Sequence, residues 1–367
     1  MLSNVQTIVI KIGSAILVDS ETQALREDWL DALADDLSQL TDKRIVLVSS
    51  GAIALGRQRL DLLGKALFLP QKQACAAAGQ SSLTRAYDDA LAKRGIVTAQ
   101  ALLTLNDTEN RRRWLNARST LETLLDLGAI PIINENDTVA TDEIRYGDND
   151  RLAARTAQMI GADLLILFSD IDGLYTADPR TDSAAKHLPL ISELTEEIVA
   201  MGGAPNAAAG VGSGGMATKL AAAQIATNAG CDMIICDGRN IGTLGALRTG
   251  AKHTRFSAKN NPRKARAHWI GGTFKPSGSL HIDSGAAQAL KTGSSLLPAG
   301  VTAVSGEFKK GDAVSIEADG VEIARGLVGY DLVDADRIKG LKSSEIAGVL
   351  GYEHGAALIH RDNLVML

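Results

Sequence analysis

The chain has 367 residues, and its 38 lysines and arginines against 43 aspartates and glutamates give a formal net charge of −5. This length predicts two or three domains, and 45% hydrophobic with 22% charged residues is typical of a folded globular protein, not of a disordered one. No stretch reaches the roughly 20 apolar residues of a membrane helix, and Lys11 and Gly13 interrupt the apolar N-terminal stretch, unlike a signal peptide. We therefore expect a cytoplasmic protein that does not contact a membrane.

The cysteines and histidines exclude several classes of enzyme. Cys75, Cys231 and Cys236 form no C-x-x-C pair, which favours buried thiols in a reducing compartment over disulfides or a zinc site. The six histidines form no H-E-x-x-H pair, and the sequence contains no G-x-S-x-G turn. These absences argue against a metallohydrolase and against a serine hydrolase.

Short apolar runs alternate with helix-length segments over the first two thirds of the chain. The predicted strands are residues 5–10, 44–48, 95–99, 129–133, 164–168 and 233–236. The predicted helices are residues 26–40, 72–93, 109–127, 151–160 and 216–229. This alternation predicts an α/β fold, a three-layer sandwich around a mainly parallel sheet, with its site beyond the carboxyl ends of the strands.

The pattern changes after about residue 250. Basic residues crowd a short stretch around Asn260-Asn261-Pro262, which is typical of an interdomain linker. Short β-like segments with glycines between them follow at residues 278–282, 313–316 and 322–328. We therefore expect a small, β-rich second domain.

Two segments of the first half indicate anion binding. Lys11 lies at the carboxyl end of a strand that is apolar on both sides of it, and a lysine in a central strand needs an anionic partner. Ser49-Ser50-Gly51 links the second strand to a helix, where free backbone N–H groups attract an anion. The alternative for this turn, an ordinary serine cap, is equally compatible with the sequence.

The most polar segment follows the strand at residues 129–133. Amides and carboxylates converge there and at the start of the next helix, more than local capping explains. Such groups suit the amino group and the carboxylate of a small zwitterion. They are Asn134, Asp137, Asp148, Asn149 and Asp150.

Two further segments indicate a nucleotide. Ser169 and Asp170 directly follow the strand at residues 164–168, where they can contact a nucleotide. The glycine-rich loop at residues 210–219 follows no strand, unlike a dinucleotide fingerprint, and lacks the Lys-Ser/Thr pair of a Walker A loop. A flexible loop that caps a helix, with Lys219 about one turn in, instead suits a polyphosphate.

Together these segments resemble the amino acid kinase family over essentially the whole chain, and specifically its branch that phosphorylates glutamate. The pieces that carry the resemblance are Lys11-Ile12-Gly13-Ser14, Ser49-Ser50-Gly51-Ala52-Ile53, Asn134-Glu135-Asn136-Asp137, Gly147-Asp148-Asn149-Asp150, Ser169-Asp170 and Gly214-Gly215-Met216-Ala217-Thr218-Lys219. The segment 277–354 resembles the PUA module that bacterial members of this branch append. The resemblance implies a kinase domain at 1–258, a linker at 259–276 and a PUA-like domain at 277–367.

The resemblance also implies a role for each candidate residue. Lys11 and Lys219 would contact the transferring phosphoryl group, and Asp150 would orient both lysines. The implied substrate residues are Ser50, Asp137 and Asn149, with Asn134 and Asp148 close by. The implied ATP residues are Lys11, Ser169, Asp170, Ser213, Gly214, Gly215, Met216, Ala217, Thr218 and Lys219.

The implied reaction is phosphorylation of the γ-carboxylate of L-glutamate by ATP, the first step toward proline. Mg²⁺ would enter with ATP, with no metal site formed by the protein itself. Proline would act as feedback inhibitor, and the kinase domain would build a dimer or a tetramer.

Two alternatives remain. Another carboxylate, carbamate or phosphate kinase of the family would keep the fold and change the substrate. An RNA-binding protein would act through the PUA-like domain, but residues 277–354 contain eleven acidic and seven basic residues, a net charge of −4. Because binding of a phosphate backbone requires a basic face, a nucleic-acid partner is not expected.

Overall fold

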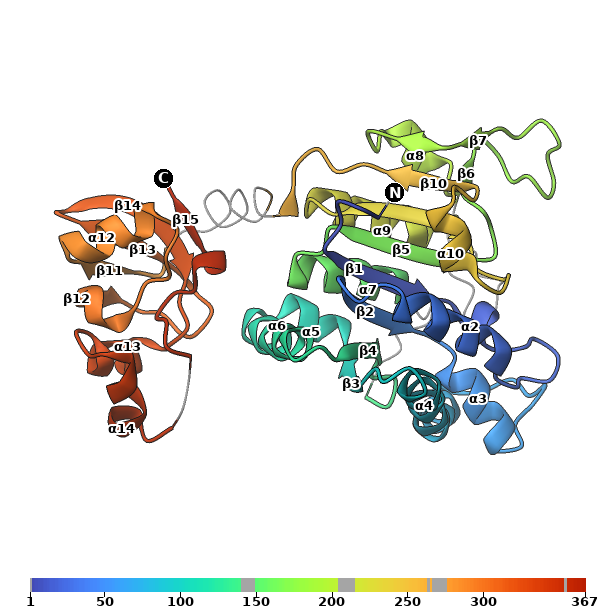
Figure 1. Cartoon of the computed structure of the whole chain (residues 1–367), viewed down its shortest axis with the longest axis horizontal. Helices are drawn as coiled ribbons and strands as arrows, with labels where there is room; N and C mark the ends of the chain where they lie inside the picture. The colour runs from blue at the N-terminus through green and yellow to red at the C-terminus, as the bar shows by residue number, and fades with distance from the viewer. Residues whose placement is uncertain (1, 140–148, 204–214, 263–264, 266–275, 353–354) are drawn as a thin grey trace. The chain divides into compact units, whose positions relative to one another are not determined.

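The computed structural model describes residues 2–139, 149–203, 215–262, 265, 276–352 and 355–367. The chain forms two compact units, Met1–Pro262 and Arg263–Leu367 (Figure 1). Most of the predicted linker at 259–276 lies outside the described residues, so its boundaries stay a prediction.

An eight-stranded sheet forms the middle of the first unit. Its strands run in the order β3-β4-β2-β1-β5-β9-β10-β8, and all neighbours are parallel except β9 and β10. The strands are β1 (Thr7–Ile12), β2 (Arg44–Ser49), β3 (Thr98–Leu103), β4 (Ile130–Glu135), β5 (Leu164–Ser169), β8 (Leu190–Ile191), β9 (Asp232–Asp237) and β10 (His253–Phe256). A separate hairpin joins β6 (Leu174–Tyr175) to β7 (His187–Leu188). This arrangement confirms the predicted, mainly parallel sheet.

Helices cover both faces of this sheet, as Figure 1 shows. One core contains apolar side chains of α2 (Glu27–Ser38), α3 (Ala52–Arg59), α4 (Leu69–Ala92) and α10 (Thr243–Arg248). The other contains those of α6 (Arg111–Asp126), α7 (Asn149–Ile160) and α9 (Met216–Asn228). The shorter helices are α1 (Ser14–Leu17), α5 (Leu105–Glu109) and α8 (Glu196–Ala200). Strand residues alternate between the two cores, because successive side chains of a strand point to opposite faces.

One predicted strand begins in the wrong place. Residues 95–99 were expected to form it, but β3 begins at Thr98. Gly95 has a φ of 70°, a left-handed conformation, and the Ile96 N–H donates to the Leu91 carbonyl, so both residues terminate α4. The apolar character of residues 95–97 therefore belongs to a helix end and not to a strand.

The second unit contains a five-stranded sheet in the order β12-β11-β13-β14-β15. Its strands are β11 (Gly278–Ile282), β12 (Val301–Gly306), β13 (Ala313–Ala318), β14 (Val321–Leu327) and β15 (Leu364–Met366), and its helices are α12 (Ser284–Lys291), α13 (Leu332–Ile338) and α14 (Ile346–Leu350). The unit has its own apolar core, and all its pairs are antiparallel except β11 with β13. This confirms the predicted β-rich domain. Within the described part of the chain, no helix is long and apolar enough to cross a membrane.

Candidate active site

The candidate residues lie at the carboxyl edge of the sheet. Lys11 is the fifth residue of β1, the strand that lies between β2 and β5, and it pairs in register with Val48 and Leu167. Asn134 and Ser169 lie at the ends of β4 and β5. Because these strands are parallel, their carboxyl ends meet along one edge, where the N-terminal turns of α7 and α9 add their own side chains.

Lys11, Asp150 and Lys219 form one buried cluster. Lys11 Nζ lies 2.7 Å from Asp150 Oδ1, and Lys219 Nζ donates to Asp150 Oδ2 at 3.0 Å. The Thr218 hydroxyl donates to the same Oδ2 at 3.1 Å. The three charged residues are 8%, 2% and 6% exposed, respectively. Two ammonium groups thus share one carboxylate, and the cluster carries a net positive charge with little water around it.

Two opposing effects act on Asp150. Burial by itself would raise the pKa of its carboxyl group, but the charges of Lys11 and Lys219 and their hydrogen bonds outweigh burial and hold that pKa below the ordinary value. Asp150 is therefore ionised throughout the physiological pH range. A fixed carboxylate of this kind holds both ammonium groups at one place.

A second cluster is built from amides and the end of β2. Asn149 Nδ2 lies within hydrogen-bond distance of three oxygens: the Ser50 hydroxyl at 2.8 Å, Asn134 Oδ1 at 3.0 Å and the Ser49 carbonyl at 3.1 Å. Asn134 and Asn149 are 2% and 5% exposed. Since Asn149 directly precedes Asp150 at the start of α7, the amide cluster and the lysine cluster are adjacent.

Asp137 follows β4 and is only partly exposed. Burial raises the pKa of its carboxyl group to about 6, because desolvation disfavours the charged form. A carboxylate held in this state gains from a cationic partner. It is therefore suited to the ammonium group of a zwitterion.

Several predicted site residues lie outside the described residues. These are Asp148, Ser213 and Gly214. Gly215 is described and is the N-cap of α9, where no described side chain caps the helix. The first turn at Met216 and Ala217 therefore presents the positive end of the helix to an anion, whereas the Thr218 N–H already donates to the Gly215 carbonyl at 3.2 Å.

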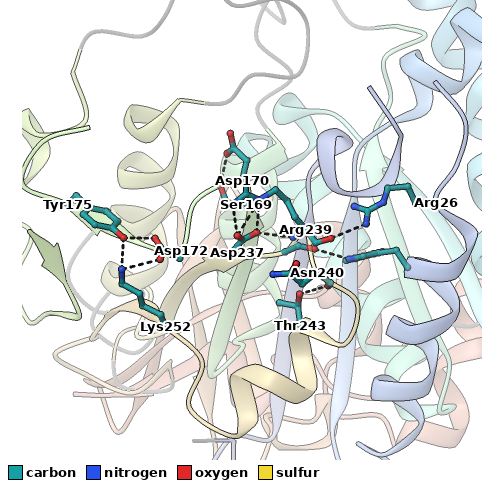
Figure 2. Close-up of polar contacts among 12 residues, drawn as sticks. Arg26, Ser169, Asp170, Asp172, Tyr175, Asp237, Arg239, Asn240, Thr243 and Lys252 are labelled. Carbon is teal, nitrogen blue, oxygen red and sulfur yellow. Dashed lines mark hydrogen bonds and ion pairs between the residues drawn. The ribbon is translucent and has the colours of Figure 1, made fainter. Parts of the chain in front are cut away.

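Ser169 and Asp170 adjoin the end of β9. The Ser169 hydroxyl donates to Asp170 Oδ1 at 3.2 Å, and Ser169 pairs in register with Asp237 (Figure 2). The Gly238 N–H donates to the Ser169 carbonyl at 2.8 Å. The segment after β9 is thereby fixed beside the predicted nucleotide residues.

Sequence reasoning missed the residues after β9. Arg239 makes a double hydrogen bond with Asp237, and this contact raises the pKa of its guanidinium group. Arg26 donates to the Arg239 carbonyl at 2.9 Å (Figure 2). The Trp29 indole donates to the Gly238 carbonyl at 2.8 Å. The sequence signal that could have indicated this segment is Asp237 at the end of a strand, since Asp170 directly follows a strand in the same way.

A cavity of about 200 Å³ lies between this segment and α10. Polar side chains in its wall include Asp172, Asp237, Asn240, Thr243 and Lys252, all drawn in Figure 2. Lys252 lies 3.1 Å from Asp172 and donates to the Tyr175 hydroxyl at 2.6 Å. The charged groups of this wall therefore already have partners: Asp172 pairs with Lys252 inside the wall, and Asp237 pairs with Arg239 beside it.

The described donor groups of the site do not form a metal centre. Within the described ranges, no three His, Cys, Asp or Glu side chains gather as metal ligands do. The Asp150 oxygens each contact a lysine, and the two ammonium groups beside this carboxylate repel a cation, so Asp150 is not placed as a Mg²⁺ ligand.

Comparison with known proteins gives the family. The model of the amino acid kinase family matches residues 6–237, and the PUA domain model matches residues 278–350. The chain belongs to the amino acid kinase family. Its members include the glutamate 5-kinase of Caulobacter vibrioides (strain NA1000 / CB15N), which is 56% identical over 362 residues, 98% of this chain and 96% of that protein.

A second curated relative agrees with this assignment. The glutamate 5-kinase of Paramagnetospirillum magneticum is 54% identical over 368 residues, 100% of this chain and 99% of that protein. Among solved structures, carbamate kinase from Giardia lamblia bound to AMP-PNP covers 70% of this chain and 99% of its own, at 17% identity and a TM-score of 0.49. The chain is thus a phosphotransferase of the amino acid kinase family with an added PUA domain, which confirms the resemblance seen in the sequence. Kinases that use ATP work with a divalent metal ion.

Proposed function

We propose that the protein transfers the γ-phosphoryl group of ATP to the side-chain carboxylate of L-glutamate, which yields L-glutamyl 5-phosphate on the route to proline. The observation that carries the proposal is the pair of ammonium groups held on Asp150, 2.7 Å and 3.0 Å from its two oxygens. Full-length similarity to glutamate 5-kinases supports the choice of substrate.

The residues present fit this chemistry. A γ-carboxylate is already an anionic nucleophile at neutral pH, so the reaction requires no general base. The difficulty is the repulsion between that anion and the phosphates of ATP, and Lys11 and Lys219 would offset the charge that spreads over the transferring oxygens. Mg²⁺ enters as part of the ATP substrate and supplies further positive charge.

The two sides of the site have different tasks. Asp137 binds the ammonium group of glutamate, and the substrate side further consists of Ser50, Asn134, Asp148 and Asn149. The nucleotide side consists of Lys11, Ser169, Asp170 and the residues from Ser213 to Lys219. Lys11 and Lys219 contact the phosphoryl group as it passes from the nucleotide to the substrate.

The decisive experiment measures ATP turnover with L-glutamate and traps the acyl phosphate with hydroxylamine as the hydroxamate. We expect hydroxamate formation with glutamate and Mg²⁺, and inhibition by proline that glutamate relieves. Aspartate and N-acetylglutamate are the matched controls. Preference for either of them, or ATP hydrolysis without hydroxamate, would overturn the proposal.

The arrangement of the whole chain is also proposed. A kinase domain at 1–258, a linker at 259–276 and a PUA-like domain at 277–367 act together in a cytoplasmic dimer or tetramer. Cys75, Cys231 and Cys236 are free and buried, which is compatible with a reducing compartment. Light scattering on the full chain measures the oligomeric state. A monomer at assay concentrations would contradict the proposed dimer or tetramer.

The raised pKa of Asp137 predicts that the affinity for glutamate depends on pH. With a pKa of about 6, Asp137 is mostly ionised at pH 7.5 but about one-quarter ionised at pH 5.5. Because the neutral carboxyl group does not attract an ammonium group, we expect the KM for glutamate to rise about fourfold over this range. Initial rates at varied glutamate and saturating ATP measure it.

The control for this prediction is Asp137→Asn, which is neutral at every pH. Its KM for glutamate should be high already at pH 7.5 and should change little toward pH 5.5. The same pH dependence in this variant as in the unmodified protein would assign the titration to another group.

A further inference from the structure

We infer that Gln80 of α4 is a positioning residue for the substrate pocket, acting through Asn134 on Asn149. Asn134 Nδ2 donates to Gln80 Oε1 at 2.8 Å, and Asn134 Oδ1 accepts from Asn149 Nδ2 at 3.0 Å. The inference rests on the proposed function, because it assigns Gln80 to the glutamate side of that site. It adds a residue from an element outside the predicted site.

The direction of this chain of amides is fixed at several points. The Glu135 N–H, which can only donate, points at Asn134 Oδ1 at 2.9 Å, so the other end of this amide is its NH₂ group. The Ser49 carbonyl, which can only accept, faces Asn149 Nδ2. Gln80 completes the pattern, because its Oε1 offers an acceptor to the NH₂ group of Asn134.

The other end of Gln80 is fixed as well. The Thr84 hydroxyl donates to the Gln80 carbonyl one turn earlier at 3.0 Å, so its oxygen is free to accept from Gln80 Nε2 at 3.3 Å. Gln80 therefore presents Oε1 and not its NH₂ group to Asn134. Turning the Gln80 amide over would place two donors face to face.

The orientation of these amides determines which atom of Asn149 can contact a substrate. Its NH₂ group faces Ser50, Asn134 and the Ser49 carbonyl, so Oδ1 is the polar atom of this amide that these contacts leave over. This oxygen is buried and has no hydrogen-bond partner among the residues that the structure describes. An ammonium group has three donors, so the glutamate that Asp137 attracts can also donate to this oxygen.

The position of α4 is itself tightly determined. A Cβ atom on Gly79 would lie 1.8 Å from the Ala52 carbonyl of α3, so only glycine permits this approach of the two helices. Tyr87, fully buried seven residues after Gln80, places its hydroxyl 2.9 Å from the Ser49 hydroxyl. Gln80, Thr84 and Tyr87 thus lie on one face of α4, at helical spacing, against the ends of β2 and β4.

The test is Gln80→Met, which keeps the length of the side chain and removes its acceptor. Asn134 Nδ2 then lacks that partner, and its amide and that of Asn149 lose their fixed orientation. We expect the KM for glutamate to rise about tenfold, with kcat and the KM for ATP changed less than about threefold. A merely structural role would lower the active fraction, and hence kcat, without this selective change of one KM.

Three further variants complete the test. Gln80→Glu keeps an acceptor toward Asn134, because the Thr84 hydroxyl can turn to donate to it, and should recover much of the affinity. In an Asn134→Ala background, Gln80→Met should have little further effect, since it acts through Asn134. Asp89→Asn on the exposed side of α4 is the matched control and should leave all constants unchanged.

The outcomes separate this inference from the proposed function. If the unmodified protein phosphorylates glutamate but Gln80→Met leaves its KM unchanged, or if the Gln80 and Asn134 effects simply add, the positioning role is wrong. If the unmodified protein forms no hydroxamate from glutamate, the proposed function itself is wrong.

Discussion

Alanine in place of Lys219 or of Lys11 is expected to lower turnover about 10²–10³-fold, with a much smaller effect on the KM for glutamate. Each ammonium group is held in place by Asp150 before the substrates bind, so it stabilises charge on the phosphoryl oxygens without reorganising. The site is only 6–8% exposed at these lysines, and water cannot replace the lost charge efficiently.

The measurement is kcat at saturating ATP and glutamate, with the hydroxamate as product. Lys186→Ala is the matched control, since this lysine is exposed and directly precedes β7. Its turnover should equal that of the unmodified protein. Near-normal turnover in both Lys11→Ala and Lys219→Ala would refute the assignment of the phosphoryl site.

The sequence allowed the lysine positions to be predicted for a physical reason. Lys11 is flanked by apolar residues, which indicates a strand buried on both faces, and β1 is indeed buried along all six residues. A lysine buried in such a strand requires an anionic partner to offset the loss of hydration of its charge. That the anion is Asp150, however, followed only from the resemblance, because nothing in the spacing of residues 11, 150 and 219 determines their contact.

The contribution of α4 could not be predicted in the same way. Gln80, Thr84 and Tyr87 repeat at helical spacing, but a polar face of a helix usually points to solvent, and only the packing shows that this one meets β2 and β4. The apolar pattern predicted the parallel strands of the sheet but misplaced the start of β3. A left-handed Gly95 ends the preceding helix there, and the apolar residues around it belong to that helix end.

Asp150→Ala is expected to be the most damaging single substitution of the site. It removes the common partner of Lys11 and Lys219, so both ammonium groups lose their positions and turnover falls at least as far as in either lysine variant. It also leaves two buried positive charges uncompensated, and removing one partner of a buried pair typically costs about 3–5 kcal/mol of unfolding free energy.

The stability that Asp150 contributes depends on pH in one direction. The folded-state pKa of Asp150 lies below its unfolded value, so the carboxylate stabilises the fold above the unfolded pKa, and this contribution declines as the pH falls below about 4. The difference in stability between the unmodified protein and Asp150→Ala should therefore stay constant from pH 8 to pH 5. Urea unfolding followed by fluorescence measures it, because Trp29 and Trp114 lie in the core of the first unit.

Asp150→Asn separates charge from shape in the same experiment. The amide keeps one oxygen that can accept from a lysine but removes the negative charge, so Lys11 and Lys219 repel each other with nothing between them to offset it. ATP brings that missing charge, and we expect it to raise the unfolding temperature of Asp150→Asn by more than it raises that of the unmodified protein. Turnover within about tenfold of the unmodified protein, together with an equal effect of ATP on both unfolding temperatures, would mean that the carboxylate does not hold the lysines for the nucleotide.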